Sequence, residues 1–316
     1  MRQPRQPRPR GAVLGDRTFG VLLRLFGGSV LLVAGAIVAV CYGLARPALA
    51  KIDLITFLTG SNWDPVQDSF GALPFIYGTL VTALIAIAIA GPVSVGLALF
   101  VTEMAPTHLR RVTTFLVEIL AAIPSVVYGL WGVMVLIPLL QTAVEPALGK
   151  MFGFLPIFSG PPMGFGYLAA GLILAIMILP TITSVIIEVL RTMPALLREG
   201  ALALGATRWE AIRMVVLPYA KRGIVGGVIL GLARALGETM AVTMVIGNQP
   251  EIHASLFSAG YSLPAVIANE FSEATGDVHV GALAGLALVL FAVTFLLSAA
   301  ARLLVRMSTR SIRVKA

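Results

Sequence analysis

The chain has 316 residues, of which 58% are hydrophobic and only 12% are charged, and its net charge is +8. Soluble domains carry about 25% charged residues, so this composition and a mean hydropathy of +0.94 exclude an ordinary soluble protein. They predict an integral membrane protein. A basic balance can indicate nucleic-acid binding, but here the basic residues stand in short segments between apolar runs, so we expect no nucleic-acid partner. The single cysteine excludes an internal disulfide, and the three scattered histidines indicate no metal site.

Residues 1–20 are predicted to be a disordered basic tail near anionic lipid, because the stretch MRQPRQPRPR cannot pack. Residues 311–316 form a short tail at the other end. The sequence Ala48-Leu49-Ala50 resembles a signal-peptide cleavage site. However, the apolar run before it is longer than a signal core, and Arg46 lies just before the motif. We therefore expect the first helix to be retained.

Six apolar runs are each long enough to cross about 30 Å of hydrocarbon as a helix. They lack the period-2 alternation of a membrane barrel, so the predicted fold is all-α, with one transmembrane domain at residues 21–310. The prolines inside this domain indicate bent helices, either for packing or for lining a pathway that opens and closes. The predicted spans are residues 21–45, 75–101, 112–140, 165–190, 223–247 and 281–305. The prolines are Pro92, Pro124, Pro138 and Pro180.

Basic and acidic residues lie on opposite sides of these spans. All but four of the 23 Lys and Arg residues precede or enter span one, follow spans two and four, or end the chain. The exceptions are Arg46, Lys51 and Lys150 in the other loops and Arg234 inside a span. By the positive-inside rule, both termini are cytoplasmic. The outer segments hold acids instead, namely Asp53, Asp64, Asp68, Glu145, Glu251, Glu270, Glu273 and Asp277.

The segment between spans four and five, residues 191–222, is too long and too patterned for a simple connector. Pro194 suits the first turn of a helix, and Gly205 suits a left-handed stop. Thr207 and Glu210 have capping-box spacing for a second helix, whose end we place before Pro218. The sequence predicts a helix, a tight turn and another helix on the cytoplasmic face.

The spacing in this segment resembles the EAA signature of ABC-importer permeases. It departs from that signature at Gly200, where Ala is usual, and at Val215, where Ile is usual. The resemblance implies a type I permease fold in which the first short helix is a coupling helix that docks in a groove of an ATPase subunit. Alternatively, Glu199 is a surface charge without a partner. The residues that the resemblance assigns to ATPase coupling are Glu199, Gly200, Ala201, Gly205, Leu217 and Pro218.

Three further stretches resemble the permease subunits of high-affinity phosphate importers, the PstC type: FGALPFIYGTLVTALIAI at 70–87, LAAIPSVVYGLWG at 120–132, and GLARALGETMAVTMVIGN at 231–248. This resemblance implies a bacterial cytoplasmic (inner) membrane location. It also implies three kinds of partner: two copies of a PstB-type ATP-binding subunit, a PstA-type second permease, and an extracytoplasmic PstS-type phosphate-binding protein. The chain contains no GxxxxGK[ST] motif, so ATP and Mg are expected in the ATPase partner and no cofactor in this chain.

Arg234 and Glu238 stand in an apolar span, where each charge costs about 2.5–3.5 kcal/mol. Their i, i+4 spacing predicts an ion pair on one helix face. Guanidinium presents a planar fork of donors to phosphate oxygens, so we interpret Arg234 as an anion ligand that Glu238 holds in place. The phosphate importers are similar in carrying both residues in this span. Alternatively, the pair only fixes packing. Thr239 and Thr243 line the same route, or they bond only to their own backbone.

Small residues recur at every fourth position of the same span, which predicts close approach of a neighbouring helix. They are Gly223, Gly227, Gly231 and Ala235. Two acids elsewhere receive no transport role, since Glu118 is interfacial and Glu188 stands three residues before Arg191.

The leading hypothesis is therefore a permease subunit of an ATP-driven phosphate importer rather than an enzyme. The alternatives are a permease for another oxyanion, an ion-coupled secondary transporter in which Glu238 titrates, a membrane enzyme, and a sensor of phosphate status. The Arg–Glu pair does not choose among oxyanions, so the choice of phosphate rests on the resemblance.

Overall fold

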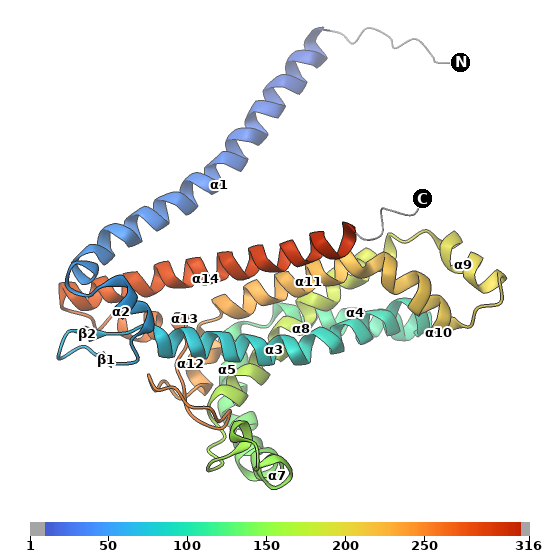
Figure 1. Cartoon of the computed structure of the whole chain (residues 1–316). Coiled ribbons are helices and arrows are strands. Elements are labelled where there is room, and N and C mark those ends of the chain that lie inside the picture. Colours follow the sequence, from blue (N-terminus) through green and yellow to red (C-terminus); the bar gives the residue numbers. More distant parts are fainter. Residues whose placement is uncertain (1–9, 311–316) are drawn as a thin grey trace.

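The computed structural model describes residues 10–310, with side chains described for 18–303. These residues form a long bundle of helices with a small two-stranded hairpin at one end (Figure 1). Within the described chain, six helices are long and apolar enough to cross a membrane, which confirms the predicted number. They are Thr18–Lys51, Leu73–Met104, Ser125–Phe152, Tyr167–Arg191, Arg208–Gly237 and Asp277–Leu303.

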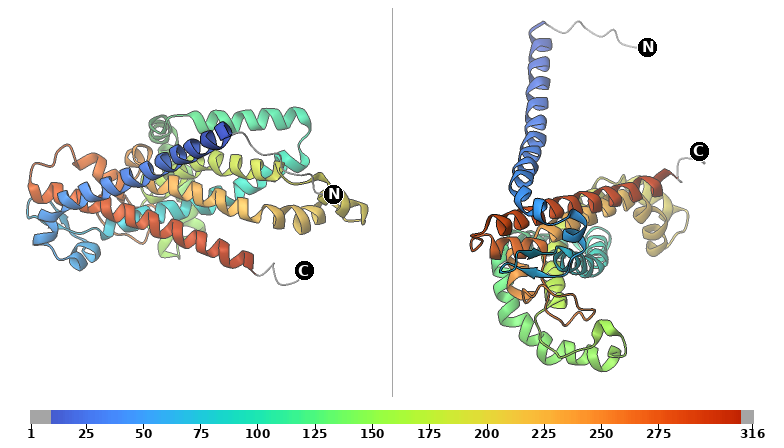
Figure 2. Two further views of the ribbon diagram at one scale, coloured as in Figure 1. Left: turned by 90° about the horizontal axis from the view of Figure 1, so that it is seen from above. Right: turned by 60° about the vertical axis from the view of Figure 1, so that its left-hand side comes forward.

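The first helix, α1 (Arg10–Lys51), begins inside the predicted disordered tail, residues 1–20. The tail prediction is therefore wrong from Arg10 onward. Residues 1–9 and 311–316 lie outside the described part of the chain. α1 packs against α14 (Asp277–Arg310) only near its C-terminal end, where Ala45 and Ala48 are buried. The rest of α1 points away from the bundle (Figure 2), and its apolar surface is left uncovered by the described chain.

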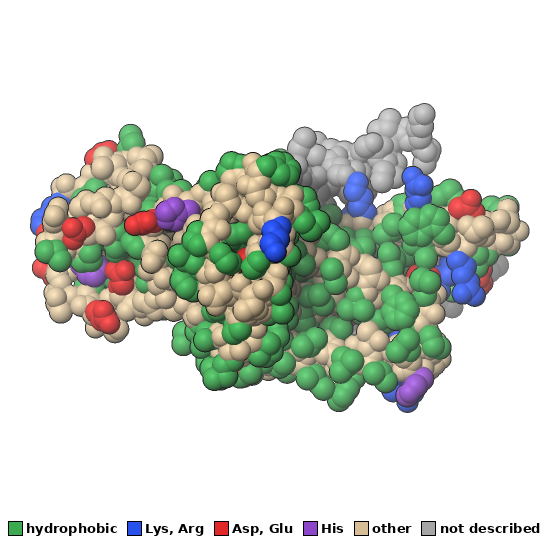
Figure 3. Space-filling model, turned by 90° about the horizontal axis from the view of Figure 1, so that it is seen from below, with side chains coloured by type: hydrophobic (Ala, Val, Ile, Leu, Met, Phe, Trp, Pro, Cys, Tyr) green, Lys and Arg blue, Asp and Glu red, His purple; other side chains and the backbone are tan. Residues whose placement is uncertain are grey.

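The end of the bundle where α1 meets α14 carries the predicted outer loops. Here lie α2 (Leu54–Thr59), strands β1 (Trp63–Asp64) and β2 (Ser69–Phe70), and α13 (Leu263–Glu270). The Trp63 indole donates to the Glu270 carboxylate at 2.9 Å, and His279 Nε2 lies 3.0 Å from the same oxygen. These contacts tie the hairpin to the start of α14. Acidic side chains gather at this end and basic ones at the opposite end (Figure 3).

The core lies between α3 (Leu73–Leu99), which continues as the π-helix η1 (Phe100–Met104), α8 (Tyr167–Arg191) and α11 (Leu217–Gly237). The Ser94 hydroxyl donates to the carbonyl of Leu179 at 3.1 Å and so joins α3 to the middle of α8. The predicted small-residue stripe packs α11 against α8, because a Cβ on Gly231 would lie 2.6 Å from Cγ1 of Ile182. Close approach of these two helices therefore requires the stripe.

The predicted third span, residues 112–140, is wrong as a single helix. α4 (Thr107–Ala122) runs along the bundle, and the chain then breaks at Ile123, whose ψ of 129° is extended. Pro124 explains the break, because proline disfavours a helical conformation in the residue before it. The following apolar helix turns crosswise to the bundle (Figure 1). It consists of α5 (Ser125–Trp131), η2 (Gly132–Leu136), α6 (Ile137–Leu139), η3 (Leu140–Val144) and α7 (Glu145–Phe152), with a short 3-10 turn η4 (Pro156–Phe158) after it.

Candidate functional site

The span that carries the two predicted site charges is broken at one of them. α11 ends at Gly237, Glu238 adopts an extended backbone with ψ 128°, and a short helix α12 (Met240–Val245) follows. The predicted continuous helix over 223–247 is therefore wrong. The Glu238 carboxylate accepts the backbone N–H of Ala241 at 3.4 Å, which offers the backbone an alternative to the helical bond. Irregular backbone at membrane depth is tolerated where it is buried in protein or lines a cavity.

Arg234 is consequently not paired with Glu238, and the predicted ion pair is absent from the described residues. The break at Glu238 removes the i, i+4 register on which that pair depended. Instead, the Arg234 guanidinium donates to the hydroxyl of Thr181 at 2.9 Å. Thr181 lies on α8 directly after Pro180. The half-buried positive charge is thus positioned by a neutral group, which leaves it able to attract an anion.

The two threonines beyond the break differ in their contacts. The Thr239 hydroxyl donates only to the carbonyl of Gly237, at 3.4 Å, as in the alternative that this threonine bonds only to its own backbone. The Thr243 hydroxyl is buried and has no hydrogen-bond partner among the described residues. α5 packs against α12 next to it, and Gly129 allows this contact, since a Cβ there would lie 3.1 Å from Cα of Ala241. The structure gives neither threonine a contact with Arg234.

The predicted helix and turn between spans four and five are present. α9 (Ala195–Ala203) starts directly after Pro194, and Gly205 adopts φ +87°. Thr207 and Glu210 form the predicted capping box, with the Thr207 N–H donating to the Glu210 carboxylate at 2.8 Å.

The second helix does not end before Pro218, as predicted, but continues into span five. α10 (Arg208–Ala211) passes through the π-helix η5 (Ile212–Val216) directly into α11. The Leu217 N–H bonds the carbonyl of Ile212, five residues back, and Pro218 then occupies the first turn of α11. Proline has no backbone N–H to donate, and it is tolerated in the first turn of an α-helix, here directly after the π-helix.

The residues of the EAA-like pattern lie on both sides of the turn. Glu199, Gly200, Gly205 and Pro218 are exposed, whereas Ala201 and Leu217 are half-buried. Their roles in coupling stay predictions. α9 and the residue directly after it also present two large apolar side chains outward, with Leu196 79% and Leu204 91% exposed. Such exposure on a short amphipathic helix indicates a surface that another protein covers.

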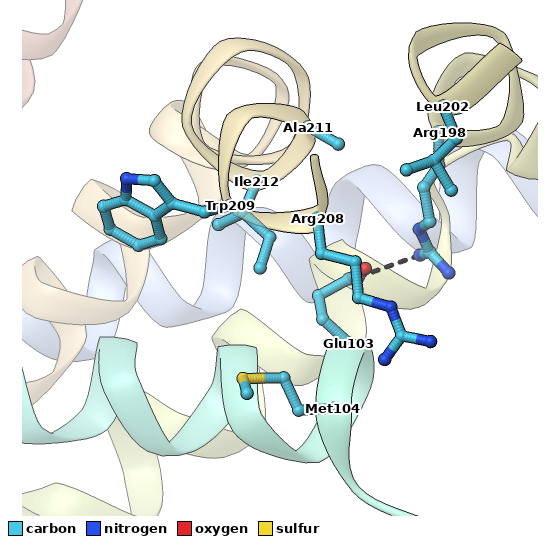
Figure 4. Close-up of a pocket in the computed structure, with 8 residues that line it drawn as sticks. All are labelled: Glu103, Met104, Arg198, Leu202, Arg208, Trp209, Ala211 and Ile212. Carbon is cyan, nitrogen blue, oxygen red and sulfur yellow. Dashed lines mark hydrogen bonds and ion pairs between the residues drawn. The ribbon is translucent and has the colours of Figure 1, made fainter. Parts of the chain in front are cut away.

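A hollow of about 560 Å³ lies between α9, the α10–η5 helix and η1 (Figure 4). Across it, Arg198 donates to the Glu103 carboxylate at 2.8 Å. The Glu103 side chain is only 5% exposed, and its residue lies in η1 at the end of span two. The ion pair therefore connects α9 to span two.

Sequence reasoning missed Glu103 and Thr181. The signal for Glu103 was present, because it is the only acid in residues 100–111 on the otherwise basic side of the membrane. Thr181 gave no such signal, since a threonine in an apolar span most often bonds its own helix.

Comparisons with known proteins show which family the sequence resembles. The family described as "Binding-protein-dependent transport system inner membrane component" matches residues 94–314. A protein of Mesorhizobium japonicum named phosphate transport system permease protein PstC is 46% identical over 98% of this chain and 96% of its own. A protein of Pasteurella multocida with the same name is 50% identical over 79% of each chain.

Solved structures support the fold. The crystal structure of a bacterial alginate ABC transporter has a chain with a TM-score of 0.61 at 15% identity, covering 97% of this chain and 99% of that one. A chain of the MetNI methionine ABC transporter in an inward-facing conformation has a TM-score of 0.53 at 21% identity, covering 76% and 94%. The fold is thus that of type I ABC-importer permeases, and the chain belongs to the family of binding-protein-dependent transport system inner membrane components.

Proposed function

We propose that the chain is the membrane-spanning permease subunit of an ATP-driven importer that carries inorganic phosphate into the cytoplasm of a bacterium. The observation that carries the proposal is the 46% identity, over nearly the full length of both chains, to a permease named for phosphate transport. The location is the cytoplasmic (inner) membrane with both termini inside, which the segregation of basic from acidic side chains supports (Figure 3).

Arg234 is the residue of this chain that we assign to the phosphate. Its guanidinium stays charged when half-buried and offers a planar fork of donors to phosphate oxygens. Thr181 holds one nitrogen of the group at 2.9 Å, and the described chain supplies no carboxylate within 4 Å to neutralise it. The helix break at Glu238 lies four residues after Arg234. Thr243, whose buried hydroxyl has no partner among the described residues, is a second polar group for the route.

The partners follow from membership in this family of importers. The family implies an ATPase and a binding protein, and we propose two copies of a PstB-type ATPase, a PstA-type permease and a PstS-type phosphate-binding protein. α9 with its exposed Leu196 and Leu204 is the docking element for the ATPase. The Glu103–Arg198 ion pair carries its displacement to span two. ATP and Mg bind to the separate ATPase subunit, and this chain is the transport subunit.

The test is uptake of labelled phosphate by the complex reconstituted in vesicles, with ATP supplied on the cytoplasmic side. Uptake must require ATP and persist when ionophores collapse proton and sodium gradients. Excess sulfate, molybdate or phosphonate must leave it unchanged. Uptake driven by an ion gradient without ATP would instead favour a secondary transporter. Strong competition by another oxyanion would identify that anion as the substrate.

A further inference from the structure

One face of α4 carries a stripe of polar side chains at the cytoplasmic end of the bundle. Thr107, Arg110, Arg111, Thr114 and Glu118 follow the spacing of one helix face. They line an open hollow of about 400 Å³, and Arg191, in the last turn of the neighbouring helix α8, lines it as well. None of these residues belongs to the proposed phosphate route or to the coupling helix.

The positive charges around this hollow are poorly compensated. Arg110 is fixed by donating to the carbonyls of Val101 and Thr102, at 2.9 and 3.2 Å, so its remaining donors have a defined position. The described residues give Arg111 and Arg191 no ion pair within 4 Å. All four charged side chains are exposed, so water screens their interactions, but three guanidinium groups beside one carboxylate, Glu118, leave a net positive charge that attracts an anion.

We propose that this hollow is a binding site for a phosphate group on the cytoplasmic side of the membrane. Three guanidinium groups require more acceptor oxygens than a carboxylate has, and a phosphate group supplies three or four in directions that suit guanidinium forks. Basic pockets between spans on the cytoplasmic side suit the head groups of anionic lipids. Soluble inorganic phosphate offers the same chemistry, and the experiment separates the two sources.

The apolar neighbours of the stripe place the site at head-group depth. Val112, Phe115, Leu116 and Ile119 on α4 are exposed to between 40% and 59%, so the helix is amphipathic and presents apolar side chains next to the arginines. Because α4 runs along the bundle, arginines beside these apolar side chains suit the level at which acyl chains meet head groups.

The test uses the complete transport complex in nanodiscs of phosphatidylcholine. In one arm, phosphatidylglycerol is added in increasing fraction; in the other, inorganic phosphate is added to the neutral nanodiscs. The thermal unfolding midpoint and the bound ligand by native mass spectrometry are recorded. The double variant Arg111→Gln/Arg191→Gln is compared with Arg213→Gln/Arg222→Gln, which removes the same charge from exposed cytoplasmic positions off the hollow.

We expect ligand-dependent stabilisation in one arm, with an apparent dissociation constant raised about tenfold or more in Arg111→Gln/Arg191→Gln and unchanged in the control. The responding arm identifies lipid or soluble phosphate as the source.

Three results would overturn the proposal. The first is no stabilisation of the wild type in either arm. The second is equal stabilisation of the wild type and Arg111→Gln/Arg191→Gln. The third is an equal loss in the control double variant, which would reduce the effect to general surface charge.

Discussion

Arg234 is held in place by a hydroxyl group on a neighbouring span. The Thr181 side chain accepts from its guanidinium at 2.9 Å, while Glu238 turns to the backbone of the next helix. A neutral partner fixes the position of the guanidinium without cancelling its charge, which suits a group that has to bind an anion and release it.

Replacing Thr181 by Val is expected to reduce phosphate uptake about tenfold, because one hydrogen bond to a charged group contributes about 1.5 kcal/mol. Thr183→Val is the matched control, two residues along the same helix. Its hydroxyl is buried and has no partner in the described chain, so its removal should leave uptake unchanged. Uptake by the reconstituted complex measures both variants, and equal activity of the two would remove Thr181 from the site.

Among the elements, those with local signals could be predicted from the sequence and those that depend on tertiary packing could not. The Thr207–Glu210 capping box and the turn at Gly205 are read directly from residue types a few positions apart. Pro124 indicated a helix break at Ile123, but the apolar run continues through both residues, so the sequence was read as one span. No proline marks the break at Glu238, and the hydropathy of the segment predicts one continuous helix in place of the two.

The turn after α9 allows a matched pair of glycine substitutions. Neither Gly200 nor Gly205 has a described heavy atom within 4 Å of an added Cβ, so only backbone conformation distinguishes them. Gly205→Ala is expected to cost about 1–2 kcal/mol, because φ is +87°. Gly200→Ala, inside α9, is expected to stabilise the helix by about 0.5–1 kcal/mol.

Hydrogen exchange of the α9 amides measures this pair. Protection should fall in Gly205→Ala and rise in Gly200→Ala. A loss of protection in both variants would contradict the assignment of Gly205 as the left-handed stop and of Gly200 as a helix interior.

The Glu103–Arg198 ion pair predicts a coupling defect. Glu103→Gln leaves Arg198 without its carboxylate, and since Arg198 is 36% exposed, water screens much of the loss, which should be on the order of 1 kcal/mol. We expect more ATP hydrolysed per phosphate transported, with the complex still assembled. The reversed pair, Glu103→Arg with Arg198→Glu, should recover part of the coupling. An unchanged ratio in Glu103→Gln would exclude this link.

The proposed orientation of the molecule in the membrane rests on the distribution of its charges. The hairpin end carries the acidic loops and the α9–α10 end carries the arginines (Figure 3), which the sequence alone could predict through the positive-inside rule. The crosswise course of α5–α7 and the divergence of α1 could not be predicted, because both elements are as apolar as the spans inside the bundle.

Orientation is tested by single cysteines in a Cys41→Ser background. A membrane-impermeant maleimide should label Asp68→Cys in spheroplasts, because Asp68 lies in the hairpin loop at the outer end. It should label Arg213→Cys, exposed on η5, only after permeabilisation. Labelling of Arg213→Cys in sealed spheroplasts would reverse the proposed topology.

We propose that Arg234 binds phosphate during its passage through the membrane. The most direct measurement is uptake of labelled phosphate by the reconstituted complex with Arg234→Gln, with subunit assembly and ATPase activity followed in parallel. We expect uptake to fall about a hundredfold or more, because two charge-assisted hydrogen bonds to the anion are lost, while assembly is retained. Uptake at the wild-type rate would contradict this role and reduce Arg234 to a packing contact with Thr181.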